Sequence, residues 1–281
     1  MERLTTLAAW RATTTSARAT GGRVGLVPTM GALHRGHRAL VAAARDRDDV
    51  VVMSVFVNPR QFNDADDLAR YPRDLERDAE LAAAWGVDVL VAPEVAEMWP
   101  DYPAPTPTTV HVAGVSEGLE GADRPGHFDG VASVVAKLLS VHGPGRAYFG
   151  EKDFQQLAVV RQMVRDLALD NEIVGVGIVR DDDGLALSSR NARLSPAGRE
   201  RALALSRALA DVARVASPDV ARATLRATLA SAGVEVAYAE VVASTTLRPL
   251  RDDERGPARA LVAGVVEGVR LIDNAPIEIG G

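Results

Sequence analysis

Two histidines at the start of a predicted helix are the residues best suited to chemistry. His34 and His37 belong to the segment 28–37 (PTMGALHRGH), which follows the apolar run 24–27 and precedes an alanine-rich apolar stretch. This pattern predicts a strand, a turn and a helix, and histidines three residues apart share one helix face. Because the first N–H groups of a helix lack partners and carry the positive end of its dipole, this position suits an anion. We therefore expect a nucleotide here, with the imidazoles over its phosphates and Gly36 under its base.

A metal site and an ordinary protein surface are the alternatives for this segment. An H-x-x-H pair can supply half of a metal site, but zinc sites usually add cysteine or a third ligand. The chain has no cysteine, and the other histidines, His111, His127 and His142, are scattered. Taken alone, the segment favours a nucleotide site over plain surface, and plain surface over a metal site.

Further polar segments follow predicted strands. Asn58 and Gln61 carry amides that can bind a hydroxyl and a carboxylate at once. The segment 150–153 (GEKD) is a second helix entry, where Lys152 could reach phosphate oxygens. Ser188–Arg190 offers two hydroxyls and a guanidinium that could contact phosphates. For each segment the alternative is a polar turn or a helix cap.

The remaining candidates are weaker. Gln156 follows Asp153 by three residues and should face the same way as the helix entry. Arg124 and His127 lie in a glycine-bearing stretch that we expect to be a surface loop. The run Asp181–Asp183 could suggest a metal, but clustered acids on a turn are usually solvated.

The predicted elements form an α/β protein. Apolar, β-branched runs predict three strands separated by two helices, at 23–29, 37–47, 50–57, 72–85 and 87–92. This β-α-β-α-β order predicts a Rossmann-like, doubly wound parallel sheet, which binds ligands at the carboxyl ends of its strands. We predict a Rossmann-like domain at 1–180 and a smaller C-terminal α+β lid domain at 181–281.

Other expected elements follow from periodicity and turn residues. We expect a leading helix at 4–17, a short strand at 110–115 and a functional loop at 118–130. In the second domain we expect a long helix at 196–216. A second helix and three strands should follow it, at 218–232, 234–243, 258–266 and 269–279.

Composition narrows the function. The net charge of -6 argues against a polyanion-binding surface as the main role. The lack of cysteine excludes a disulfide scaffold and fits a reducing compartment. No signal peptide and no apolar run of spanning length is visible. The phosphate loop G-x-x-x-x-G-K-[ST], the G-x-G-x-x-G fingerprint and the G-x-S-x-G elbow are also missing, so a phosphate site here must use histidines and helix entries.

Six ordered motifs together resemble one family. The H-x-G-H segment resembles the signature of the HIGH superfamily of nucleotidylyl transferases and class I aminoacyl-tRNA synthetases. Within it, the chain is most similar to the pantothenate synthetase (pantoate–β-alanine ligase) family. The matching segments, which span nearly the whole chain, are 28–37, 56–62, 71–73, 124–128, 149–156 and 183–191, and the C-terminal segment 270–274 also fits.

The resemblance implies a two-step ligase whose Rossmann-like domain at 1–180 binds ATP and pantoate. ATP and (R)-pantoate would give an enzyme-bound pantoyl adenylate and pyrophosphate, and β-alanine would then give pantothenate and AMP. Mg²⁺ would accompany the ATP phosphates, and its protein ligands are not implied. The family also implies a cytoplasmic homodimer that binds neither nucleic acid nor membrane, and a second domain that closes over the site to exclude water.

The resemblance also implies roles for individual residues. The catalytic residues would be His37, His34, Lys152 and Arg190, with His37 as the acid-type catalyst. ATP would be bound by Met30, Gly31, Ala32, Leu33, His34, Arg35, Gly36, His37, Gly150, Glu151, Lys152, Asp153, Val179, Leu187, Ser188, Ser189 and Arg190. Pantoate would be bound by Gln61, Gln156 and Met30, and β-alanine by Gln61.

Two departures and two alternatives accompany this reading. The superfamily's K-M-S-K-S motif is replaced by Ser188-Ser189-Arg190, as in the pantothenate synthetase family itself. Arg60 and Leu187 stand where many relatives would have methionine, and the effect of Arg60 is open. The alternatives are another adenylate-forming or nucleotidylyl-transferring enzyme of the superfamily, and a non-enzymatic nucleotide sensor.

Overall fold

The computed structural model describes residues 1–280, which divide into two compact units. The first unit comprises Met1–Glu151 and Val159–Gly177, and the second comprises Lys152–Ala158 and the chain from Ile178 onward. The predicted fold class is confirmed, because a parallel α/β sheet is accompanied by a smaller sheet with its own helices. The predicted division into domains at residue 180 remains a prediction. In the structure, Lys152–Ala158 group with the second unit.

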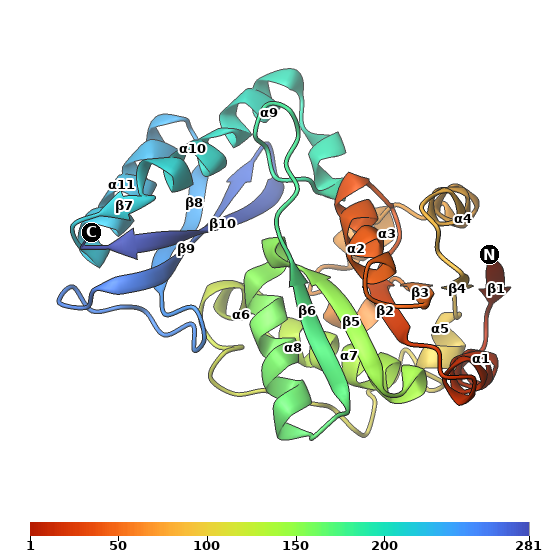
Figure 1. The fold of residues 1–281 in the computed structure, drawn as a ribbon. Coiled ribbons are helices and arrows are strands. Elements are labelled where there is room, and N and C mark those ends of the chain that lie inside the picture. Colours follow the sequence, from red (N-terminus) through yellow and green to blue (C-terminus); the bar gives the residue numbers. More distant parts are fainter. Residues whose placement is uncertain (281) are drawn as a thin grey trace. The chain divides into compact units, whose positions relative to one another are not determined.

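The first unit is built on a six-stranded parallel sheet. Its strands are β1 (Glu2–Leu4), β4 (Val89–Val91), β3 (Val50–Val55), β2 (Val24–Thr29), β5 (Gly145–Gly150) and β6 (Asn171–Val176), in this spatial order (Figure 1). Every neighbouring pair runs parallel. Central strands β2 and β3 are almost continuously apolar because helices cover both of their faces.

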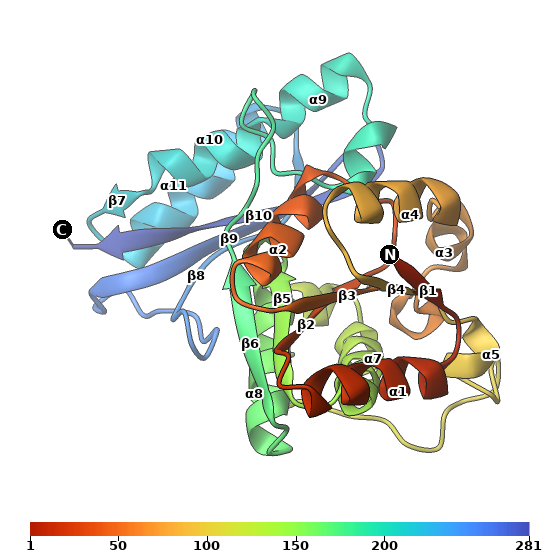
Figure 2. The same ribbon diagram turned by 45° about the vertical axis from the view of Figure 1, so that its right-hand side comes forward.

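Helices pack on both faces of this sheet. Figure 2 shows α2 (Arg35–Arg45) and α4 (Leu75–Ala84) on one side, and α1 (Leu7–Ala19) and α7 (His127–His142) on the other. Leu40 and Val41 of α2 and Ala82 of α4 join Met53 of β3 in one buried cluster. The helices therefore fix the strands, and with them the loops at the strand ends.

The chain order reverses at β2, and this reversal defines a ligand-binding edge. Strand β2 lies between β3 and β5, with Leu26 in register with Val52 on one side and with Ala147 on the other. In doubly wound sheets the crevice at such a switch point, outside the carboxyl ends of the strands, is the usual ligand site. The segments that carry His34 and Gly150 begin at this edge.

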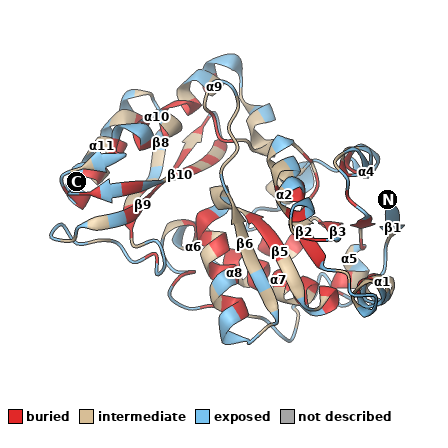
Figure 3. Cartoon of the chain, viewed as in Figure 1, coloured by how far each residue is buried: buried red, intermediate tan, exposed pale blue. Residues whose placement is uncertain are grey.

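The second unit contains a four-stranded sheet with helices on one face. Its strands are β7 (Arg214–Val215), β10 (Val269–Ile279), β9 (Gly256–Val266) and β8 (Glu235–Val242), in this order. Helices α10 (Ala204–Asp211) and α11 (Pro218–Ser231) pack on it and share its buried core, which appears red in Figure 3. Alternate residues of β9 and β10, such as Ala260 and Leu271, supply that core.

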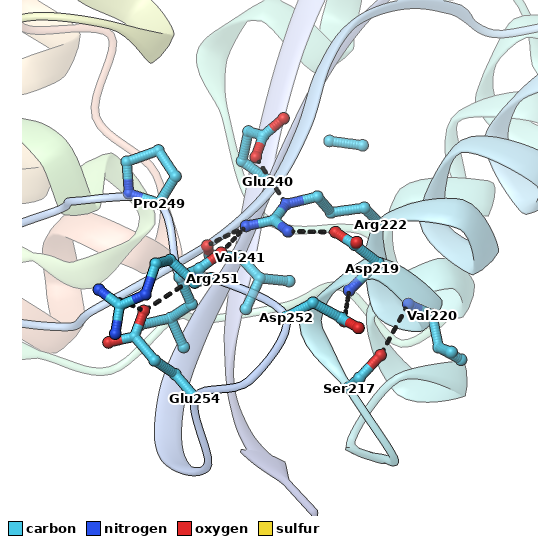
Figure 4. Close-up of polar contacts among 12 residues, drawn as sticks. Ser217, Asp219, Val220, Arg222, Glu240, Val241, Pro249, Arg251, Asp252 and Glu254 are labelled. Carbon is cyan, nitrogen blue, oxygen red and sulfur yellow. Dashed lines mark hydrogen bonds and ion pairs between the residues drawn. The ribbon is translucent and has the colours of Figure 1, made fainter.

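Arg222 of α11 ties this helix to the sheet and to the loop after β8. Its guanidinium contacts Asp219 at 2.7 Å and Glu240 at 2.9 Å, and donates to the carbonyls of Val241 and Leu250 at 3.2 and 2.6 Å (Figure 4). Only 17% of this side chain is exposed. These contacts satisfy a largely buried charge, so Arg222 is a structural centre of the second unit.

The remaining helices and 3₁₀ turns complete the list of elements. They are the helices α3 (Ala65–Arg70), α5 (Val95–Met98), α6 (Leu119–Asp123), α8 (Phe154–Asp166) and α9 (Pro196–Ala202), and the 3₁₀ turns η1 (Pro59–Gln61), η2 (Glu151–Asp153) and η3 (Ser189–Arg193). No helix among residues 1–280 is long and apolar enough to cross a membrane.

Several expected elements were wrong. The expected helix at 4–17 starts only at Leu7, because Leu4 ends strand β1, and residues 110–115 form no strand. The expected loop at 118–130 contains α6 and the start of α7, which begins after Gly126 in the left-handed conformation. The expected long helix at 196–216 is interrupted at Leu203, so α9 and α10 are separate and residues 214–215 pair with β10.

Candidate functional site

His34 and His37 cap the entrance of α2 reciprocally. The Nδ1 atom of His34 accepts from the backbone N–H of Gly36 at 3.1 Å, and the Nδ1 atom of His37 accepts from the N–H of His34 at 3.2 Å. The two ring centroids are 4.1 Å apart. Because both Nδ1 atoms accept, each neutral ring carries its proton on Nε2. The pair therefore presents two Nε2–H donors of fixed tautomer at the start of the helix.

A buried carboxylate shapes the loop that leads into this helix. Asp78 of α4 accepts from the N–H groups of Ala32 and Leu33 at 2.9 and 2.8 Å, and the residue is 3% exposed. Gly31 and Ala32 both have positive φ, at 82° and 51°. A Cβ atom at Gly31 would lie 2.6 Å from Asp78 Oδ2, so glycine is required for this close approach. Asp78 thus holds the strained loop before His34.

Gln61 is oriented by a chain of hydrogen bonds. The indole Nε1–H of Trp99 donates to Asn58 Oδ1 at 3.0 Å, and Asn58 Nδ2 donates to Gln61 Oε1 at 3.0 Å. Since Oε1 of Gln61 is the acceptor, its Nε2 is the donor, and it lies 3.1 Å from the sulfur of Met30. The loops after β2 and β3 therefore meet at Met30 and Gln61, with the amide N–H₂ of Gln61 on the Met30 side.

The backbone of Gln61 is fixed by two residues that we expected on a surface loop. His127 is buried, and its Nδ1 lies 2.8 Å from the carbonyl oxygen of Gln61. Arg124 donates to the same oxygen at 3.2 Å and lies 3.1 Å from His127 Nε2. The expectation for Arg124 and His127 was wrong because α7 packs directly on η1. A Cβ at Gly130 would lie 2.2 Å from the carbonyl oxygen of Arg60.

Arg60 places its guanidinium against two aromatic rings. Its guanidinium lies over the rings of Trp99 and Tyr102, at 5.1 and 5.8 Å, and donates to the carbonyl of Ala104 at 2.7 Å. The ammonium of Lys137 also lies over the Trp99 ring, at 4.5 Å, and burial lowers the pKa of Lys137 below its ordinary value. Arg60 therefore holds the 99–104 segment through cation–π contacts.

A second group of predicted residues lies around η2. Gly150 ends β5 and Glu151 opens η2 in the first unit, whereas Lys152, Asp153 and Gln156 belong to the second unit. The Lys152 ammonium lies 3.7 Å from the Asp153 carboxylate, and the lysine side chain is 19% exposed. Gln156 is half-buried in the first turn of α8. The turn thus presents a partly shielded ammonium.

The residues 179–190 form a backbone-paired loop. The N–H of Leu187 donates to the carbonyl of Val179 at 3.0 Å, and Arg180 and Ala186 form an antiparallel bridge. Ser188 caps η3, its hydroxyl accepting from the N–H of Arg190 at 3.3 Å. The loop therefore supports Ser188, Ser189 and Arg190 on a defined hairpin.

The acidic run beside this loop binds an arginine. Arg199 contacts Asp183 at 2.7 Å and Asp181 at 2.8 Å, and the hydrogen bond from Arg199 lowers the pKa of Asp183. Within residues 1–280 no group of three or more His, Cys, Asp or Glu side chains could hold a metal ion. The run Asp181–Asp183 is therefore an ion-pair centre of the second unit.

The structure thus places the predicted residues in two groups. The first unit brings together the His34/His37 pair and the Met30/Gln61 contact at the carboxyl edge of its sheet, and the second unit holds Lys152 and the Ser188–Arg190 loop. Sequence reasoning missed Asp78 and Trp99. Their partners are 45 and 41 residues away in the chain, and no local signal marks them apart from the position of Asp78 in a first helical turn.

Comparisons with known proteins agree with this arrangement. The family model described as pantoate-beta-alanine ligase matches residues 2–276. The pantothenate synthetase of Deinococcus radiodurans is 54% identical over 276 residues, covering 93% of this chain and 96% of the relative. That of Moorella thermoacetica is 49% identical over 287 residues, covering 99% of each.

Solved structures give the same result. A crystal structure of pantothenate synthetase from Thermus thermophilus matches with a TM-score of 0.88 at 49% identity, covering 98% of this chain and 99% of the other. The pantoate-beta-alanine ligase from Francisella tularensis, solved with beta-gamma ATP and β-alanine, matches with a TM-score of 0.81 at 32% identity, covering 98% of this chain and 97% of that one. The fold, the histidine pair and these full-length matches place the chain in the pantoate–β-alanine ligase family, to which it belongs.

Proposed function

We propose that this chain condenses (R)-pantoate with β-alanine at the expense of ATP, through an enzyme-bound pantoyl adenylate. The observation that carries the proposal is the reciprocal cap of His34 and His37, which fixes two Nε2–H donors at the switch point of the sheet. Family membership supports the choice of reaction, and the Francisella tularensis relative was solved with beta-gamma ATP and β-alanine.

In the first step a carboxylate oxygen of pantoate attacks the α-phosphorus of ATP. The bond from that phosphorus to the bridging oxygen breaks, and pyrophosphate leaves. The protein's task is to position the two anions and to stabilise the charge that shifts onto the phosphates. His34 and His37 would do so by donating Nε2–H to phosphate oxygens.

The caps make His37 a hydrogen-bond donor in this step. Its Nδ1 already accepts from the N–H of His34, so adding a proton there would break the cap. The resemblance gives His37 as the acid-type catalyst, and we propose that it fills this role by donating a hydrogen bond from the Nε2–H of a neutral imidazole instead of transferring the proton. Lys152, Ser188, Ser189 and Arg190 would bind ATP phosphates. The remaining nucleotide contacts would come from Met30–Gly36, Gly150, Glu151, Asp153, Val179 and Leu187.

Gln61 supplies recognition of the acid. Because Asn58 occupies its Oε1, the Nε2–H₂ group is the part left to donate to an anionic or hydroxyl oxygen. Met30 forms the apolar wall beside it, and Gln156 would donate to the same substrate. The same Gln61 amide would later help to place β-alanine.

In the second step the β-alanine amine attacks the acyl carbon of the adenylate. The bond between that carbon and the phosphate oxygen breaks, AMP leaves, and the amine loses a proton to solvent. We propose that Mg²⁺ enters with ATP and is held through its phosphates, because Mg²⁺ at nucleotide sites is usually bound by substrate phosphates and water. We further propose a cytoplasmic homodimer, as the family implies.

Isotope transfer tests the proposed route. With pantoate labelled by ¹⁸O in its carboxylate, one labelled oxygen should appear in the phosphate of AMP, because the carboxylate oxygen stays on phosphorus when the acyl bond breaks. AMP that contains no ¹⁸O although pantothenate forms would refute the adenylate. Absence of pantothenate with every substrate present, together with ATP binding, would favour a nucleotide sensor.

A further inference from the structure

Two adjacent residues near the C-terminus, Asp273 and Asn274, have no place in the chemistry described so far. They end the segment 270–274 that fits the family pattern, and both are buried, at 3% and 2% exposure. They lie on β10, where successive side chains point to opposite faces of the sheet. Leu271 and Ile277 face the core under α10 and α11, so Asp273 shares their face and Asn274 lies on the other.

Asn274 holds the turn that carries Lys152. Its Nδ2 donates to the carbonyl oxygen of Lys152 at 2.9 Å. Its Oδ1 accepts from Nε of Arg259 at 2.7 Å, so the amide can have only this orientation. The guanidinium of Arg259 lies 4.1 Å from the ring centroid of Phe154, the first residue of α8. Asn274 and Arg259 therefore contact the chain on both sides of Asp153, Asn274 at the preceding residue and Arg259 at the following one.

Asp273 holds the loop that carries Ser188. Its carboxylate accepts two hydrogen bonds from Arg180, from Nη1 at 2.6 Å and from Nη2 at 3.0 Å. The Arg180 side chain also donates to the carbonyl of Gly184 at 3.1 Å, and its backbone forms an antiparallel β-bridge with Ala186. The two parallel hydrogen bonds hold the Arg180 guanidinium in one plane with the carboxylate. They therefore fix Arg180, and with it the hairpin partner Ala186, which lies two residues before Ser188.

We propose that Asp273 and Asn274 are positioning residues that hold the Lys152 turn and the Ser188–Arg190 loop in one fixed arrangement for binding the phosphates of ATP. A single dipeptide of β10 reaches both segments because its two side chains leave opposite faces of the strand. The hydrogen bond between Asp273 Oδ1 and the N–H of Asn274, at 2.8 Å, links the two halves. This inference rests on the proposed role of Lys152, Ser188, Ser189 and Arg190 in adenylate formation.

The test changes single atoms at the two positions. Asn274→Asp keeps the acceptor for Arg259 but places a carboxylate oxygen against the Lys152 carbonyl, where a donor is needed. Asp273→Asn leaves Arg180 with one acceptor instead of two. Asp252→Asn is the matched control, because Asp252 accepts from the N–H of Asp219 elsewhere in the second unit.

Each half-reaction is measured separately on the full chain. Pyrophosphate release from ATP, Mg²⁺ and pantoate reports the first, and pantothenate formation from supplied pantoyl adenylate and β-alanine reports the second. We expect Asn274→Asp and Asp273→Asn to slow the first at least tenfold, to raise the KM for ATP, and to leave the second and the KM for pantoate within twofold. Asp252→Asn should leave both half-reactions within twofold.

The outcomes separate positioning from general weakening of the fold. Folded variants that keep the first half-reaction, or that lose both half-reactions equally, would overturn the inference. If Asn274→Asp does not fold, Arg259→Lys removes the Nε donor while keeping a cation beside Phe154, and it should impair the first half-reaction alone. Failure of the unsubstituted protein to release pyrophosphate with pantoate would refute the proposed function instead.

Discussion

Replacing Trp99 by phenylalanine tests whether Gln61 recognises the acid in a fixed orientation. The change removes one buried donor, the indole N–H that binds Asn58 Oδ1 at 3.0 Å, and keeps an aromatic ring for Arg60 and Lys137. Asn58 then retains the N–H of Arg60, at 3.4 Å, on that oxygen. The amide of Asn58 becomes less firmly held, and so does the Gln61 amide that it orients.

The expected size follows from one lost hydrogen bond. A neutral intramolecular hydrogen bond contributes about 1 kcal/mol net, and leaving a buried acceptor poorly satisfied costs about 1–3 kcal/mol. If about 1–2 kcal/mol of this reaches Gln61, the KM for pantoate rises about 5- to 30-fold, because 1.4 kcal/mol corresponds to a factor of ten. The KM for ATP should stay within about twofold, since the His34/His37 pair keeps its own caps.

The matched control is Trp10→Phe. Trp10 is fully buried in the same unit, and its indole N–H makes no hydrogen bond within residues 1–280. Both variants lose a similar volume, so both should lower the free energy of unfolding, but only Trp99→Phe should change the KM for pantoate. In a Gln61→Leu background the effect of Trp99→Phe on that KM should vanish. Equal KM values for pantoate in the two tryptophan variants would refute the reasoning.

Four further changes have defined outcomes. His37→Ala should slow pyrophosphate release about 100-fold or more in a folded protein, because it removes a charge-stabilising donor; near-normal turnover would exclude that role. Asp78→Asn should lower both stability, by about 2–4 kcal/mol in urea unfolding, and the first half-reaction, because it leaves an N–H of the strained loop without its carboxylate acceptor. Burial lowers the pKa of His142 from 6.5 to about 3, so its contribution to stability should be complete above pH 6.5. Below pH 6.5 the free energy of unfolding should fall by up to about 1.4 kcal/mol per pH unit as the pH drops towards 3. Urea titrations at several pH values should show this loss in the unsubstituted protein and not in His142→Asn. Arg222→Ala should lower the free energy of unfolding measured in urea by about 2–4 kcal/mol, whereas Arg226→Ala, at a side chain that is 52% exposed, should lower it by under about 1 kcal/mol. Equal losses in the two variants would contradict the central role of Arg222.

The parallel sheet could be predicted because its signals are local. The runs 24–27 and 50–55 are almost continuously apolar, and a capped segment follows each of them, α2 after His34 and the 3₁₀ turn η1 after Asn58. Strand β1 could not be recognised, since Glu2–Leu4 is short, mostly polar and gains its pairing only from β4. The break at Leu203 has no glycine or proline to mark it, so one long helix was expected where the chain forms two.

The sequence predicts the candidate binding residues of the site but not the residues that orient them. His34, His37 and Gln61 stand out by type, spacing and position after a strand, and these signals need no knowledge of the tertiary structure. The residues that orient them come from elsewhere in the chain. Asp78 lies on α4 and binds the loop before His34, and Trp99 lies after β4 and binds Asn58. Both contacts form only when the chain is folded. His127 was assigned to a surface loop because the tight approach of α7 to η1 at Gly130 has no sequence signature beyond the glycine itself.

The most direct test of the account is pyrophosphate release from ATP and Mg²⁺ with pantoate, measured with and without β-alanine. The account predicts a burst of about one equivalent per site without β-alanine, because the adenylate stays bound, followed by steady turnover when β-alanine is added. Release that requires β-alanine from the start, or release with another acid and none with pantoate, would contradict it.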